Sequence, residues 1–100
     1  MSYHSKMKNP ATDQLFEAIL RLESIEECYR FFDDICTIKE IRSLAQRLQV
    51  AKLLETSKTY SEIEELTGAS TATICRINKC LNYGADGYKL ILERIKEGDA

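Results

Sequence analysis

The stretch from Thr59 to Leu81 carries two helix-start signals with a helix-stop signal between them, and this constrains the fold more than any other feature. The residues TYSE at 59–62 fit the capping box S/T-x-x-E, in which a hydroxyl and a carboxylate satisfy backbone N–H groups at a helix start. Gly68 readily adopts the left-handed conformation of a helix end. Ser70 then offers a new cap, and neither Gly nor Pro interrupts the residues that follow it to Leu81. The spacing predicts a helix-turn-helix over about residues 59–81.

The second predicted helix has two chemically different arcs when its residues are placed at roughly 100° intervals. The apolar arc, which must pack inward, holds Ser70, Ile74, Ile77 and Leu81. The opposite arc holds Thr71, Ala72, Cys75, Arg76 and Lys79. Small residues near the N-terminus of a helix can approach base edges, and the two cations can reach phosphate or guanine. No acidic residue occurs from Ser70 to Tyr83, so this arc favours DNA binding, although a two-helix corner in any all-α protein can show the same pattern.

Apolar residues at intervals of three and four predict further helices on both sides of this unit. These are Asp13–Leu22, which follows Pro10 and takes Thr12 as its cap; a helix from the Ser24 cap to Ile35; a helix from the box at Thr37 to Leu54; and a last helix from Tyr88 to Gly98. Six helices and no strand emerge. The predicted fold class is therefore all-α, with the helix from Thr37 to Leu54 as its central strut.

Length and composition indicate one domain: residues 1–11 are expected to form a flexible arm and residues 12–97 a single all-helical domain. There is no apolar run long enough for a membrane span and no secretory signal, so the expected location is the cytoplasm, without a membrane partner. The net charge of −2 weakens a nucleic-acid interpretation, but charge is segregated. The predicted reading helix is basic, while carboxylates gather at Glu23, Glu26, Glu27, Asp33 and Asp34.

The cysteines Cys28, Cys36, Cys75 and Cys80 form no C-x-x-C pair, and His4 is the single histidine. A metal site is therefore not expected, no cofactor is predicted, and the thiols are expected to be free. The chain also lacks a G-x-S-x-G motif and a phosphate loop, which argues against an enzyme.

The first two predicted helices carry more apolar surface than a chain of 100 residues can readily hide. An intertwined homodimer would cover it and would place two reading helices about one DNA turn apart. Three alternatives stay open: a compact monomeric bundle, a dimeric adaptor that joins proteins without binding DNA, and a monomeric DNA reader like the replication-initiator domain.

The residues LAQRL at 44–48 and TGASTATICR at 67–76 resemble the Trp repressor family, most of all its YerC-type members in Gram-positive bacteria. The likeness extends over roughly residues 15–95 and is most specific in the G-A-x-x-A-T-I-x-R run. It implies an interlocked, all-helical homodimer that binds a palindromic double-stranded DNA operator as a transcriptional regulator. Thr71, Ala72, Thr73 and Cys75 fall where the family reads the major groove. Together with the arc above, the expected DNA contacts are Ser70, Thr71, Ala72, Thr73, Cys75, Arg76 and Lys79.

The resemblance also implies the remnant of an effector pocket. In tryptophan-binding members two arginines sandwich the indole ring and a threonine backs the pocket, and Arg47, Arg76 and Thr37 match these positions. Two departures stand beside them: Ile77 replaces a glycine, and Cys80 replaces the serine that serves the amino group of the ligand. Overfilling a packed site costs about 1–3 kcal/mol, so tryptophan is not the expected ligand. Either Ile77 occupies the indole space and holds the reading helix constitutively, or an unknown small molecule binds.

Other positions have two interpretations. Arg76 can donate to DNA phosphate or form an ion pair within the scaffold, and Arg47 can be an ion-pair partner or a ligand clamp. Ser61 and Glu64 stand where the repressor has basic residues, which should weaken phosphate contacts or change the operator.

Overall fold

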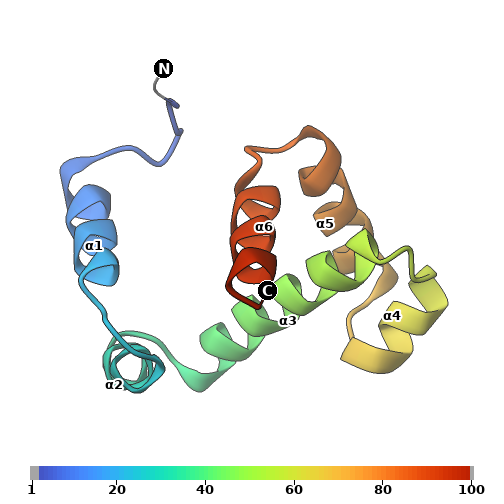
Figure 1. The fold of residues 1–100 in the computed structure, drawn as a ribbon, viewed down its shortest axis with the longest axis horizontal. Coiled ribbons are helices and arrows are strands. Elements are labelled where there is room, and N and C mark those ends of the chain that lie inside the picture. Colours follow the sequence, from blue (N-terminus) through green and yellow to red (C-terminus); the bar gives the residue numbers. More distant parts are fainter. Residues whose placement is uncertain (1–2, 100) are drawn as a thin grey trace. The chain divides into compact units, whose positions relative to one another are not determined.

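The computed structural model describes residues 3–99, and within them the regular structure is entirely helical (Figure 1). The predicted all-α fold class is confirmed. The helices are α1 Pro10–Leu20, α2 Ile25–Ile35, α3 Ile38–Glu55, α4 Tyr60–Thr67, α5 Thr71–Tyr83 and α6 Gly87–Asp99.

The polar side chains predicted to begin three of these helices do so. The Ser24 hydroxyl accepts a hydrogen bond from the backbone N–H of Glu27, which caps α2. At α4 both halves of the capping box form: the N–H of Glu62 donates to the Thr59 hydroxyl at 3.2 Å, and the N–H of Thr59 donates to the Glu62 carboxylate at 2.9 Å. The Ser70 hydroxyl caps α5 by accepting from the N–H of Thr73.

The first helix differs from its prediction at both ends. Asn9, not Thr12, is the cap, because its side-chain oxygen accepts from the N–H of Thr12 while Pro10 occupies the first helical position. Asn is a preferred cap and Pro a preferred first residue, since its missing N–H would be unpaired there anyway. The helix ends at Leu20, not Leu22. It begins inside residues 1–11, the segment predicted to be a flexible arm, whose residues 1 and 2 lie outside the described part.

Contacts along the chain group into two compact units, Met1–Ile38 and Lys39–Ala100. In the first unit neither α1 nor α2 contains a buried residue. Its local contacts include ion pairs between Lys8 and Asp13 at 2.5 Å and between Arg30 and Glu26 at 3.3 Å. The rings of Phe31 and Phe32 also meet edge to face. Large apolar side chains such as Leu20, which is 83% exposed, therefore have no cover within this unit.

The second unit contains the hydrophobic core. Val50 and Ala51 of α3, Ile63 of α4 and Ile74 of α5 are fully buried. The same cluster is completed by Ala69, Ile77, Leu81 and Leu92. Helix α4 packs against α5, α5 packs against α6, and Figure 1 shows all three grouped along α3.

The turn between α4 and α5 is held by the backbone and by side chains on either side of it. Gly68 has a φ of 74°, the left-handed conformation predicted for it, and its N–H donates to the Glu64 carbonyl. The Thr67 hydroxyl donates to the Ile63 carbonyl and accepts from the N–H of Ala69. From α3, the Gln46 amide donates to the Thr67 carbonyl at 3.1 Å. These bonds fix the turn that sets the direction of α5.

The capping box makes α4 sensitive to pH. The backbone N–H of Thr59, and then its hydroxyl, hydrogen-bond the Glu62 carboxylate and hold the pKa of this group below its ordinary value of 4.5. A group with a lowered pKa in the folded state contributes stability that is present above pH 4.5 and is lost as the pH falls through the lowered pKa. Glu62→Ala should therefore lower the urea unfolding midpoint at neutral pH, and this difference from the wild type should shrink in acid.

The matched control is Glu65→Ala, which removes an exposed glutamate from the same helix without touching the box. Its difference from the wild type should not follow the same pH profile. A gap between Glu62→Ala and the wild type that is as wide in acid as at neutral pH would contradict this role of the box.

Candidate nucleic-acid interface

Helix α5 presents a polar and basic arc to solvent. Its inward residues Ile74, Ile77 and Leu81 are buried, as the helical wheel predicts. The opposite arc is exposed along its length, at Thr71, Ala72, Cys75, Arg76 and Lys79. Of the remaining predicted contacts, Thr73 is half-buried, and Ser70 is exposed at the helix cap instead of packing inward.

The electrostatic character of this arc is positive near its middle and acidic at one edge. The cations Arg76 and Lys79 lie on α5, which has no acidic residue. At the first residue of the helix, however, the Thr71 hydroxyl donates to the carboxylate of Glu64, which comes from α4. The N-terminal end of α5 therefore carries hydrogen-bonding oxygens, and the next turns carry positive charge.

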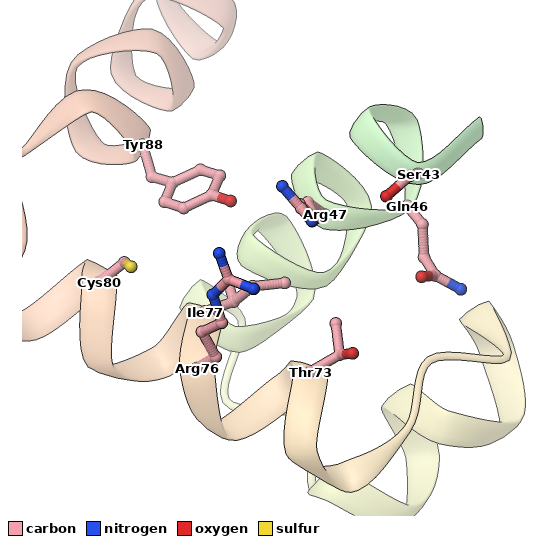
Figure 2. Close-up of a pocket in the computed structure, with 8 residues that line it drawn as sticks. All are labelled: Ser43, Gln46, Arg47, Thr73, Arg76, Ile77, Cys80 and Tyr88. Carbon is pink, nitrogen blue, oxygen red and sulfur yellow. The ribbon is translucent and has the colours of Figure 1, made fainter. Parts of the chain in front are cut away.

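A pocket of about 130 Å³ lies on another side of α5, between this helix, α3 and α6 (Figure 2). Figure 2 shows the side chains of Arg47 from α3, Arg76 from α5 and Tyr88 from α6 directed into the same space. The lining residues are Ser43, Gln46, Arg47, Thr73, Arg76, Ile77, Cys80 and Tyr88. Of the described residues, none that lines it is acidic.

The pocket brings together four of the five residues predicted as an effector-pocket remnant: Arg47, Arg76, Ile77 and Cys80. The fifth, Thr37, belongs to the first unit, whereas the lining residues all come from the second. Ile77 is only 3% exposed and belongs to the core cluster, so it lines the pocket from the side of the core. Within residues 3–99 neither Arg47 nor Arg76 forms an ion pair, and the roles of these arginines stay predictions.

Sequence reasoning missed Ser43, Gln46 and Tyr88 as pocket residues. A signal existed for the first two, because Ser43 stands four residues before Arg47 and three before Gln46, which places all of them on neighbouring parts of one helix face. The sequence pattern indicates Tyr88 only as an apolar position of the last helix. Its place in the pocket depends on how α6 packs against α5, which no local pattern encodes.

Two other structural features bear on the chemistry of the chain. Among the described residues, no three His, Cys, Asp or Glu side chains gather as metal ligands would. The helices of that part of the chain are also too short or too polar to cross a membrane.

The geometry agrees with what comparisons with known proteins show. Residues 11–96 match the model of the family described as Trp repressor protein. The chain is 60% identical over 92 residues to the uncharacterized protein YerC of Bacillus subtilis (strain 168), which covers 92% of this chain and 88% of that protein.

Solved structures give the same picture. The crystal structure of a candidate Trp repressor from Staphylococcus aureus superposes with a TM-score of 0.87 at 55% identity, over 91% of each chain. That of a TrpR like protein from Eubacterium eligens ATCC 27750 superposes with a TM-score of 0.88 at 56% identity, over 91% of this chain and 94% of the other.

The burial of Ile77 predicts a large effect of truncation. Ile77→Ala should lower the free energy of unfolding by about 2–5 kcal/mol, because it removes buried methyl groups and leaves a cavity beside the pocket. Cys75→Ala, which changes an exposed side chain of the same helix, should stay within about 0.5 kcal/mol of the wild type. Urea unfolding at one fixed protein concentration measures both. A small effect of Ile77→Ala would mean that this side chain stands in open space.

Proposed function

Because this chain belongs to the Trp repressor family, we propose that it is a sequence-specific DNA-binding regulator of transcription that acts as a homodimer on an operator with two-fold symmetry. The proposed role is binding, with no catalytic step. The observation that carries it is the exposed arc of α5, held by a helix-turn-helix whose opposite side is fully buried.

The arc has the chemistry that a duplex requires. The second helix of a helix-turn-helix lies in the major groove with its first residues against base edges. Here those residues are Thr71, Ala72, Thr73 and Cys75, whose small side chains let the backbone come close to the bases. Arg76 and Lys79 follow about one and two turns later, where they can meet phosphate oxygens.

The overall charge of −2 does not oppose this role, since the charges are unevenly distributed. Non-specific DNA affinity depends on cations that meet phosphates. The α5 surface offers such cations without neighbouring carboxylates on the same helix, while the acidic residues of α2 occupy the other compact unit. A protein of this kind would bind its operator through a local basic surface and keep weak affinity for DNA in general.

Dimer formation explains the apolar surface that one chain leaves uncovered. Leu20 and Tyr29 of the first unit are 83% and 66% exposed, and Tyr83 of the second is 85% exposed. The second unit also has an apolar hollow of about 440 Å³, lined by Leu48, Cys80, Ala85, Gly87, Tyr88 and Ile91. An apolar hollow and large exposed apolar side chains are features of interfaces, and a second copy of the chain is the proposed occupant of the hollow.

The same arrangement accounts for the two compact units. Helices α1 and α2 bury no residue within one chain, so their stability would come from the partner in an intertwined dimer. Residues 12–97 would then behave as one folding domain per chain within the dimer, preceded by the arm.

Tryptophan is not the proposed effector. Ile77 lines the pocket from the side of the core, and a residue of its size stands where the tryptophan-binding members need a glycine. The side chain would hold α5 in its reading position without a ligand, so that binding to the operator is constitutive.

Selection of bound duplexes from a random pool tests the proposal. The purified protein should enrich a palindrome whose half-sites lie about one helical turn apart. The affinity for the enriched duplex should fall steeply with salt concentration and should be the same with and without tryptophan. Enrichment of no sequence would contradict the DNA-binding role and favour a dimeric adaptor between proteins. Tighter binding in the presence of tryptophan would contradict the role of Ile77.

A further inference from the structure

A carboxylate stands at the base-reading end of α5. Glu64 is half-buried on α4, where its backbone carbonyl accepts from the N–H of Gly68 in the turn. Its side chain extends to α5 and accepts the hydroxyl proton of Thr71, the first residue of that helix. The pair thus joins the two helices of the motif at the place where the second helix begins.

This contact changes what Thr71 can offer to a ligand. A free threonine hydroxyl can donate a hydrogen bond or accept one. Because the Thr71 hydroxyl already donates its hydrogen bond to Glu64, its oxygen can only accept a further one. An ionised carboxylate also only accepts. At this point the start of α5 therefore presents only hydrogen-bond acceptors, whereas a free threonine hydroxyl could also donate.

In the major groove only two bases present donors: cytosine through its N4 amino group and adenine through its N6 amino group. Guanine and thymine present acceptors at the corresponding edges, which would face the acceptors of the protein. We infer that Glu64 and Thr71 form a specificity-determining pair that selects an exocyclic amino group, on cytosine or adenine, at one base position of each half-site. This rests on the proposed DNA-binding function.

The pair also lowers affinity for DNA in general. A carboxylate beside the groove repels phosphate oxygens, so every duplex that does not supply the amino group meets an unfavourable charge. Glu64 therefore discriminates mainly by weakening the binding of duplexes with the wrong base.

The test uses the full-length protein and the duplex that it enriches. Replacing the contacted cytosine or adenine by guanine or thymine should weaken wild-type binding about tenfold. The same replacement should weaken binding no more than about twofold in Glu64→Ala, where the Thr71 hydroxyl is free to donate, and in Glu64→Gln, where the amide NH2 can itself donate. Both variants should bind random duplexes more tightly than the wild type. Fluorescence anisotropy at one salt concentration measures all of these affinities.

Glu65→Gln is the matched control, because it removes the same charge from the next residue of α4, which has no contact with Thr71. It should keep the tenfold penalty of the wild type. Far-UV circular dichroism checks that each variant is folded, and either Glu64 variant alone suffices for the comparison.

Two results would overturn the inference. One is a base penalty in the Glu64 variants equal to that of the wild type at every position of the half-site, which would leave the proposed function intact. The other is a wild-type protein that binds no duplex, which would remove the proposed function and the inference with it.

Discussion

Burial of Ile63 and Ile74 in one cluster with Val50 and Ala51 is the interaction on which the arrangement of the second unit depends. Each of these side chains is fully removed from solvent, and together they join α4 and α5 to α3. Full burial of one such aliphatic side chain stabilises the folded state by roughly 1.5–3 kcal/mol. Gln46 and Gly68 then fix the turn between the two shorter helices. The exposed arc of α5 has a defined direction only because the opposite side of the helix is held in this way.

Helix α5 serves three surfaces at once. One side belongs to the core, a second lines the pocket through Ile77 and Cys80, and a third carries the proposed DNA contacts. Thr73 and Arg76 belong to both the pocket lining and the proposed contacts. Ile77 belongs to both the core and the pocket, so any change that moves this side chain must also move the reading helix. In the proposed function the apolar packing of Ile77 holds α5 in its reading position, whereas the tryptophan-binding members of the family use a ligand for this. Arg47 and Arg76, which line the pocket, would then have no indole ring to sandwich.

Local chemistry made much of the helix-turn-helix predictable from sequence. The capping box at Thr59, the left-handed Gly68 and the cap at Ser70 are short-range signals, and each determines its helix end in the structure. The error at α1 also has a local cause, since Asn9 and Pro10 together form a stronger start signal than Thr12. Apolar residues at intervals of three and four identified the inward side of α5 correctly, because the number of residues per helical turn does not depend on neighbouring helices.

Features that depend on how helices cross were not predictable in the same way. The place of Tyr88 in the pocket requires the packing of α6 on α5, and the hydrogen bond between Glu64 and Thr71 requires the angle between α4 and α5. From sequence, Glu64 is only an acidic residue where a basic one is expected. Six of the seven predicted DNA contacts are exposed as a reading helix requires, Thr73 is half-buried, and their role stays a prediction. The thiol of Cys75, exposed on that arc, and the thiol of Cys80, exposed at the pocket, report on two sides of the same helix. The most direct measurement is therefore the rate of alkylation of each thiol, followed by mass spectrometry with and without a saturating amount of enriched duplex. Slower alkylation of Cys75 in the bound protein, with a rate at Cys80 that the duplex does not change, is the predicted result, and an unchanged rate at Cys75 would contradict the account.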